Sequence, residues 1–302
     1  MTRRDFIEKN AHLTMGLGLL AITYANCASL QPGKEQENPA DLPQFKVRPP
    51  VLNPLPNVYM SLALEVVYVI KCGGRSVLVD SGFHHNLDSH LANFKTAGID
   101  MNTIDAIFAT HCHVDHTGGL SLAKKRLKCP VFAHKNSVDV IQSGDKAATA
   151  AEMPYIGWKF QYPPCKIDEV VEDGDEVALG DTTFRVIHLP GHTPDSTGYF
   201  WENKLLSGDA LFSLGGLGWS DVHWGSNFDD AIETMHRLTE LNPEYLLPTH
   251  GAPFRFDKLI GRKGEENARD MLEGNRAGAV KFTKRAPLAR AGRTPRKILG
   301  RG

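Results

Sequence analysis

The sequence predicts an α/β domain in which sheets and helices pack in layers. Stretches with the spacing of amphipathic helices alternate with apolar runs that are typical of buried strands. Hairpins, a helix and a strand follow one another in the same way twice, so the chain has two similar halves. Hydrophobic residues make up 41% of the 302 residues, which supplies a large core and excludes disorder of the whole chain.

The first half begins with a hairpin at residues 64–82, where two apolar strands flank a turn at Gly73 and Gly74. Helical spacing over residues 87–98 stops at Gly98. The continuous apolar run at residues 104–110 predicts a strand buried on both faces. A helix and a strand complete this half, at residues 121–127 and 130–135.

The second half starts near Asp175 and contains two further hairpins, at residues 176–189 and 197–209. Residues 228–241 place apolar side chains on one stripe, which predicts an amphipathic helix. Residues 244–251 form a last apolar strand that ends in a loop. Each half therefore delivers polar residues at the ends of buried strands.

The first 28 residues are expected to be a targeting segment outside the fold. Arg3 and Arg4 precede an apolar stretch at residues 11–25, which is too short to span a bilayer. The T-R-R-x-F-I run resembles the twin-arginine export signal, so we expect the twin-arginine machinery to deliver a periplasmic or secreted protein. A cytosolic N-terminal helix is the alternative. Cys27 leaves a lipid anchor open, and no integral membrane span is expected in the mature form.

The remaining chain divides into a linker, a catalytic domain and a tail. Seven prolines within residues 29–57 predict an extended linker, and the catalytic domain is placed at residues 58–273. Residues 274–302 contain nine Lys or Arg residues and no acidic residue. Such a tail is expected to be solvated, with contact to anionic lipid or to a partner as the alternative.

Charge and cysteine content exclude several function classes. Lys plus Arg total 34 and Asp plus Glu total 35, so the surface lacks the excess of cations that a dedicated nucleic-acid binder needs. The five cysteines include no C-x-x-C pair, which argues against a zinc ribbon and a thioredoxin site. The sequence indicates no oligomeric state, and the partner we expect is a small-molecule substrate.

The run T-H-C-H-V-D-H-T-G-G is the strongest chemical signal in the chain. It places His111, His113, Asp115 and His116 directly after the buried strand at residues 104–110. Alternation along an extended segment points His111 and His113 in the same direction. Cys112 then faces the other way and is expected to pack in the core rather than to bind a metal.

Three further loops supply residues of the same kind. His192, Asp209 and His250 each follow an apolar strand, so all can converge on one edge of the sheets. Such residues at strand ends often only cap turns when they occur singly. Neutral imidazole and carboxylate are ligands for zinc or iron, and a carboxylate can bridge two ions. Together these side chains predict a metal site.

With these residues in place, the sequence between about residues 58 and 255 resembles the metallo-β-lactamase superfamily. The resemblance rests on the runs VLVDSG, HCHVDH, PGHT, GDALF and PTHG. It implies a first metal site at His111, His113 and His192. It implies a second site of Asp115, His116 and His250, with Asp209 as the bridging carboxylate. Asp80 is implied to orient a ligand imidazole.

The resemblance also implies a fold and a reaction. The fold would be a four-layer αβ/βα sandwich with the metals at one edge of two facing sheets. Two divalent ions would be bound, with zinc as the first choice and iron or manganese as alternatives. A metal-bound hydroxide would attack an ester, thioester, lactone or related carbonyl substrate. Asp115 would be catalytic, because it can also accept a hydrogen bond from that hydroxide.

The residue at the bridging position narrows the choice among the branches of the superfamily. True metallo-β-lactamases carry Cys or Ser where this chain has Asp209, which points instead to the branch of dinuclear hydrolases that includes glyoxalase II and the lactonases. Phe212 stands where the lactonases usually have Tyr, and no glutathione-binding run follows GDALF. A mononuclear iron sulfur-dioxygenase and a metal-loaded, non-catalytic binding protein are the alternatives. The complete second set of ligands argues against the dioxygenase.

Two aromatic segments are expected to line the substrate mouth, with aromatic packing beneath a loop as the alternative. The first lies between the two halves and contains Tyr155, Trp158, Phe160 and Tyr162. The second is a glycine-rich loop after the bridging position and contains Trp219, His223 and Trp224.

Overall fold

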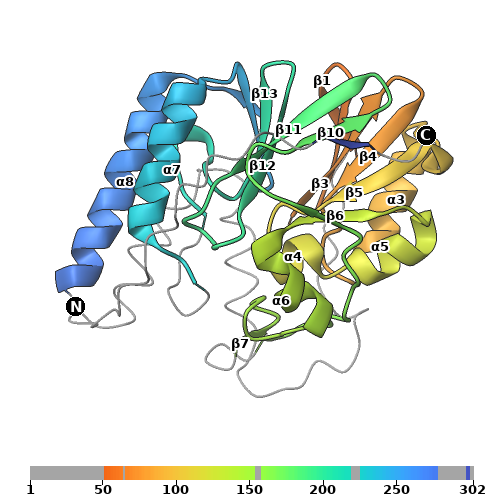
Figure 1. Ribbon diagram of the computed structural model, residues 1–302, viewed down its shortest axis with the longest axis horizontal. Coiled ribbons are helices and arrows are strands. Elements are labelled where there is room, and N and C mark those ends of the chain that lie inside the picture. The colour runs from red at the N-terminus through yellow and green to blue at the C-terminus, as the bar shows by residue number, and fades with distance from the viewer. Residues whose placement is uncertain (1–50, 64, 154–157, 219–224, 278–296, 300–302) are drawn as a thin grey trace.

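The computed structural model describes residues 51–63, 65–153, 158–218, 225–277 and 297–299 (Figure 1). Two sheets face each other, and helices cover the outer face of each. The order of layers is helix, sheet, sheet, helix. The four-layer αβ/βα sandwich is therefore confirmed, with the two halves of the sequence forming its two sides.

The first sheet is antiparallel from β1 to β4 and parallel from β4 to β9. Its described strands, in spatial order, are β1 (Val51–Leu55), β2 (Val58–Leu62), β3 (Val66–Cys72), β4 (Arg75–Val79), β5 (Ile104–Phe108), β6 (Val131–His134) and β9 (Glu169–Val171).

The second sheet is mostly antiparallel, with parallel pairs at β13–β14 and β10–β16. Its described strands, in spatial order, are β15 (Phe254–Arg255), β14 (Tyr245–Pro248), β13 (Lys204–Gly208), β12 (Thr197–Trp201), β11 (Thr182–His188), β10 (Glu176–Leu179) and β16 (Lys297–Leu299). A separate small hairpin pairs β7 (Glu152–Met153) with β8 (Trp158–Lys159).

Helices lie on the two outer faces and in the loops at the strand ends (Figure 1). The first half contains α3 (Leu87–Thr96), α4 (Val114–Thr117), α5 (Leu120–Leu127) and α6 (Val138–Ser143). The second half contains α7 (Phe228–Leu241) and α8 (Lys258–Ala277), which pack against each other. Short 3-10 turns are η2 (Met101–Thr103), η3 (Lys135–Ser137) and η4 (Ser213–Gly215). No helix in these described ranges combines the length and the apolar character needed to cross a membrane.

The alternation of side chains along each strand separates the cores of the layers. In β3, Val66, Tyr68 and Ile70 point between the two sheets, whereas Val67 and Val69 point toward the helices of the first half. Both sets are buried, which explains why the strand is a continuous apolar run. A third core lies beneath α7 and α8, so each layer boundary excludes water.

Two expected boundaries are corrected by the structure. Residues 51–57 were assigned to the linker at 29–57, but Val51–Leu55 is strand β1 and pairs with β2. The prolines of this stretch are typical of a linker, but Pro54 lies in an edge strand, which tolerates a proline that an inner strand does not. In the basic tail at 274–302, α8 continues to Ala277 and Lys297–Leu299 pairs with β10. Residues 1–28, including Cys27, lie outside the described residues.

Candidate metal centre

Seven histidine and aspartate side chains meet at one edge of the two sheets. Each follows a strand: β5 leads to His111 and His113 and then to Asp115 and His116 in α4. The second half contributes one residue after each of three strands, namely His192 after β11, Asp209 after β13 and His250 after β14. The structure brings all seven together in overlapping groups. Their role as metal ligands remains a prediction.

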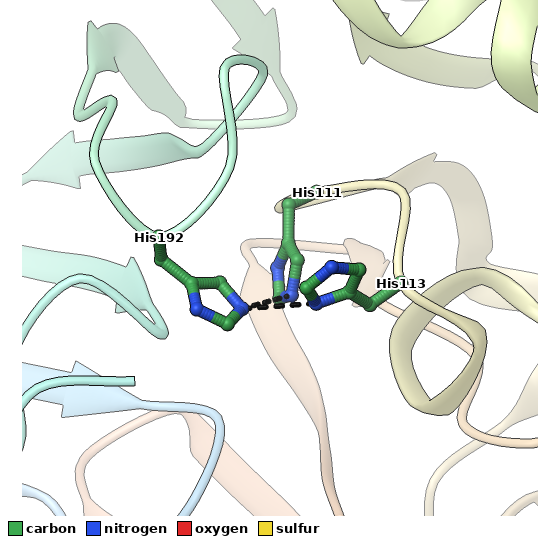
Figure 2. Close-up of side chains that lie close together, drawn as sticks. All are labelled: His111, His113 and His192. Carbon is green, nitrogen blue, oxygen red and sulfur yellow. Dashed lines mark hydrogen bonds between the residues drawn. The ribbon is translucent and has the colours of Figure 1, made fainter. Parts of the chain in front are cut away.

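The first group consists of three buried imidazoles from both halves of the chain (Figure 2). The Nε2 atom of His192 lies 3.2 Å from Nε2 of His111 and 3.0 Å from Nδ1 of His113. A tetrahedral zinc ion with Zn–N bonds near 2.05 Å would separate its nitrogen ligands by about 3.3 Å. The spacing of the three nitrogens therefore fits one divalent ion.

The second group combines two imidazoles with a carboxylate. The Oδ2 atom of Asp115 lies 3.1 Å from Nε2 of His250 and 3.4 Å from Nε2 of His116. The Nε2 atom of His116 is buried and has no hydrogen-bond partner among the described residues. A buried nitrogen that faces carboxylates without a hydrogen bond is the arrangement that a cation would complete. The donor set suits zinc or another divalent metal.

Asp209 lies between the two groups. Its Oδ2 atom is 3.6 Å from Nε2 of His192 in the first group. The same oxygen is 3.8 Å from Nε2 of His116 and 3.5 Å from Nε2 of His250 in the second group. This position allows one carboxylate to contact ions in both groups.

A single buried carboxylate orients an imidazole in each group. Asp80 Oδ2 accepts a hydrogen bond from Nδ1 of His116 at 3.0 Å and from the Thr110 hydroxyl at 2.8 Å. Because this hydroxyl donates to Asp80, its oxygen can accept a hydrogen bond from Nδ1 of His111, which is 3.0 Å away. Each histidine would then offer the lone pair of its Nε2 atom to a metal ion at the centre. The sequence pointed to Asp80 but missed Thr110.

Asp209 is held by two residues that the sequence did not single out. The hydroxyl of Thr249 donates to Oδ1 of Asp209 at 2.7 Å, which leaves Oδ2 to face the histidines. The backbone of Gly218 donates to the carbonyl of Asp209 at 3.0 Å. A Cβ atom at residue 218 would lie 2.8 Å from Nδ1 of His192, so only glycine allows this close approach.

Burial and charge set opposite protonation tendencies in the two groups. Burial lowers the pKa of His113 to about 4 and that of His192 to about 3. Both side chains are therefore neutral at physiological pH, as metal binding requires. Burial also acts to lower the pKa of His250, but Asp209 and Asp115 raise it to about 9. The two carboxylates of the second group thus favour a positive charge at this position.

Solvent reaches the centre from the side of the second group. The side chains of Asp115 and His250 are 25% and 23% exposed, whereas those of His192 and Asp209 are 5% and 7% exposed. The Phe212 ring lies edge-on to the ring of His250 at 6.1 Å. The second group is therefore the more exposed part of the centre among the described residues, and Phe212 lies beside it.

Most of the side chains expected to line the substrate mouth lie outside the described residues. Tyr155, Trp219, His223 and Trp224 lie outside the described residues. Trp158 belongs to β8, but its side chain also lies outside them. The other two residues expected at the mouth are Phe160 and Tyr162. Phe160 is half-buried, with its ring centroid 4.8 Å from that of Phe83. Tyr162 is buried, and its hydroxyl is hydrogen-bonded to Thr117 and to the Cys112 carbonyl. That expectation for Tyr162 is wrong, because its ring fills the core beside Phe83 and Val114. The Cys112 side chain packs in the core, as predicted.

The family model of the metallo-beta-lactamase superfamily matches residues 64–250 of the chain. The chain belongs to the metallo-beta-lactamase superfamily. The matched range contains Asp80 and all seven side chains of the centre. Membership of this superfamily implies that the centre binds divalent metal ions, although it does not name the metal.

Curated relatives within the superfamily have hydrolase names. A probable metallo-hydrolase of Methanocaldococcus jannaschii is 30% identical over 182 residues, which cover 59% of this chain and 84% of that protein. An acyl-coenzyme A thioesterase of Gallus gallus is 31% identical over 216 residues, covering 64% and 74%. A hydroxyacylglutathione hydrolase of a Marinomonas species is 30% identical over 182 residues, covering 58% of each chain.

Solved metallo-beta-lactamases share the fold. The subclass B3 enzyme of Bradyrhizobium japonicum superposes with a TM-score of 0.62 at 22% identity, covering 76% of this chain and 96% of that chain. The enzyme of Legionella gormanii gives a TM-score of 0.62 at 19% identity, with the same coverage. At such identities the comparison shows a shared fold alone.

Proposed function

We propose that this protein is a hydrolase with two divalent metal ions, most simply zinc, that cleaves an ester, thioester or lactone in a small molecule. The observation that carries the proposal is the position of Asp209, whose Oδ2 lies within 3.8 Å of imidazoles in both groups. A carboxylate shared by two cations offsets their mutual repulsion.

The chain's own residues would divide the work between the groups. His111, His113 and His192 would hold the first ion, and Asp115, His116 and His250 the second, with Asp209 between them. When bound, such ions lower the pKa of a coordinated water to about 7 and polarise a carbonyl oxygen. Asp115 is the partly exposed carboxylate of the centre, so we assign it the role of orienting the attacking water by accepting its hydrogen bond.

A thioester is the substrate class that the relatives favour. The thioesterase of Gallus gallus acts on acyl-coenzyme A by its name, and the Marinomonas relative is a hydroxyacylglutathione hydrolase. Asp209 and the open side at Asp115 and His250 are compatible with attack on any such carbonyl. A thioester therefore heads the set of substrates to be tested.

The decisive experiment counts metals and measures turnover in the same preparation. We expect two zinc ions per chain and hydrolysis within a panel of ester, thioester, lactone, β-lactam and phosphodiester substrates. In Asp209→Ser, hydrolysis should fall by about tenfold or more, while at least one ion stays on the three imidazoles. One iron per chain with oxygen consumption on a persulfide would instead establish a dioxygenase. Bound metal without any turnover would establish a binding protein.

We also propose that the protein is exported through the twin-arginine machinery and acts in the periplasm or outside the cell. The proposal rests on Arg3 and Arg4 before the short apolar stretch at residues 11–25. Replacing both arginines by lysine should leave the protein in the cytoplasm in a cell-fractionation experiment. Unchanged export of that variant would contradict the proposal. Labelling with a radioactive fatty acid, with Cys27→Ala as the control, tests the lipid anchor.

A further inference from the structure

Glu65 is a buried carboxylate outside the seven-residue centre, and its side chain and the backbone next to it contact the two segments that hold His116 and His250 in place. The side chain of Glu65 is 1% exposed, and its Oε1 atom accepts three hydrogen bonds. The donors are the backbone of Phe83 at 3.3 Å, the amide of Asn86 at 3.1 Å and Nε2 of His90 at 3.1 Å. Through these contacts Glu65 fixes the loop between β4 and α3.

That loop holds His116. The backbone and the hydroxyl of Ser81 both donate to the carbonyl of His116, at 2.8 and 2.9 Å. The next residue, Gly82, packs so closely on Glu65 that a Cβ atom there would lie 2.6 Å from Oε1. A shift of the Glu65 carboxylate would therefore be transmitted to the loop and to the backbone of His116.

The backbone next to Glu65 holds the segment that supplies His250. The amide of Val66 donates to the carbonyl of Thr249 at 2.9 Å, and Thr249 directly precedes His250. The Thr249 hydroxyl in turn bonds to Asp209. Glu65 thus stands at the junction of the two segments that supply His116 and His250.

Only one oxygen of this carboxylate is satisfied by hydrogen bonds among the described residues. Its second oxygen, Oε2, is buried and has no hydrogen-bond partner among the described residues, which is a cost to folding. Burial and the nearby charge of Asp115 act to raise the pKa of Glu65, but the hydrogen bond from His90 lowers it overall. An ionised carboxylate is thus retained close to the second group.

We infer that Glu65 is a positioning residue for the second metal group, and that the hydrogen bonds it accepts from Phe83, Asn86 and His90 set the affinity of that group without contact to the metal. The inference rests on the proposed two-metal function. The first group has its own buried carboxylate, which provides a matched comparison. Asp195 lies in the loop that supplies His192 and is 2% exposed. It accepts hydrogen bonds from Ser137 at 2.7 Å and from Cys112 at 3.5 Å.

The test is a titration of metal-free protein with Co²⁺, followed by visible absorption. His250→Ala and His192→Ala give reference spectra for Co²⁺ in the first and second group. Glu65→Gln keeps the shape of the side chain and removes the charge that strengthens its three hydrogen bonds, so it should weaken Co²⁺ binding in the second group by about tenfold or more and leave the first nearly unchanged. Asp195→Asn should show the opposite pattern.

A loss of fold would weaken both groups alike, so the crossed pattern separates positioning from general destabilisation. Asn86→Ala removes only one of the three donors, and it should weaken the second group in the same direction by a smaller factor. If the wild-type protein binds two Co²⁺ and Glu65→Gln weakens both groups equally or neither, the inference is wrong. If the wild-type protein binds only one Co²⁺, the two-metal function fails, and this inference fails with it.

Discussion

The hydroxyl of Thr110 helps to orient the histidines of the centre, although a threonine gives no such signal in the sequence. It donates a hydrogen bond to Asp80, which also accepts one from His116 Nδ1, and it lies within hydrogen-bond distance of His111 Nδ1. One carboxylate and one hydroxyl therefore fix the ring orientation of a histidine in each group. Such partners of metal-binding histidines contribute to affinity although they do not touch the ion.

Thr110→Val should lower the affinity for zinc by about 10- to 100-fold, because it removes the hydroxyl and keeps the shape of the buried side chain. The measurement is competition with a chromophoric chelator. Thr110→Ser retains a hydroxyl and should bind zinc nearly as well as the wild type. Equal affinities for the valine and serine variants would show that the hydroxyl does not orient His111.

Gly218 sets the space around Asp209 and His192. A Cβ atom there would lie 2.5 Å from the carbonyl oxygen of Asp209 and 2.8 Å from Nδ1 of His192, so Gly218→Ala should displace one or both. We expect zinc affinity to fall by about tenfold or more. Gly216→Ala is the matched control in the same loop, since its nearest neighbour would be 3.5 Å away. Similar affinities for the two variants would contradict this account.

At the level of elements, the strands and helices around the centre follow from simple local patterns. The hairpin of β3 and β4, the helix α7 and the strand β14 all lie where their apolar spacing predicted them. The β1–β2 hairpin was missed because its prolines indicated a linker. The helix α8 was missed because most of its residues are polar or charged, so that only a few apolar residues mark its buried face.

The start of α7 is fixed by one side chain. Asn227 Oδ1 accepts hydrogen bonds from the backbones of Asp229 and Asp230, at 3.0 and 3.3 Å. Asn227→Ala should lower the free energy of unfolding by about 1 kcal/mol, whereas Asn227→Ser should lower it much less. Urea denaturation measures both. An alanine variant as stable as the wild type would mean that packing of α7 against the sheet alone defines this helix end.

The sequence predicted the seven side chains of the centre better than their surroundings. The H-x-H-x-D-H run and three strand ends are visible as residue types in order, so their convergence followed from the direction of the strands. Thr110, Thr249 and Glu65 are ordinary residues whose roles depend on partners far away in the chain. No local sequence pattern identifies such partners, because they come together only in the folded structure.

Across the whole molecule, the two halves meet at a pair of stacked histidines. The rings of His134 and His188 lie 4.3 Å apart and almost parallel, and Nδ1 of His134 accepts a hydrogen bond from the backbone of Asn136. Burial, followed by the charge of His188, lowers the pKa of His134 to about 3, against 6.5 for the free side chain. Between about pH 3 and pH 6.5, the unfolded chain therefore carries a proton on His134 that the folded protein does not bind.

It follows that the contribution of His134 to stability is complete above pH 6.5 and is lost as the pH falls toward 3. His134→Asn retains an acceptor for Asn136 but does not titrate there. Between about pH 7 and pH 4, the free energy of unfolding should therefore fall less steeply in this variant than in the wild type. Guanidinium denaturation at several pH values gives the two slopes. Parallel slopes would show that His134 is not kept neutral by the fold.

The three imidazoles of the first group also have a consequence for folding. His113 and His192 are 79 positions apart in the chain and follow strands of opposite sheets, so an ion held by both would close a long loop. A crosslink of this kind restricts the unfolded chain, and the entropy it removes grows with the logarithm of the loop length. Unlike a disulfide, this crosslink can be withdrawn by a chelator and restored by adding metal. The supply of metal would then control how firmly the two halves stay joined, in addition to controlling catalysis.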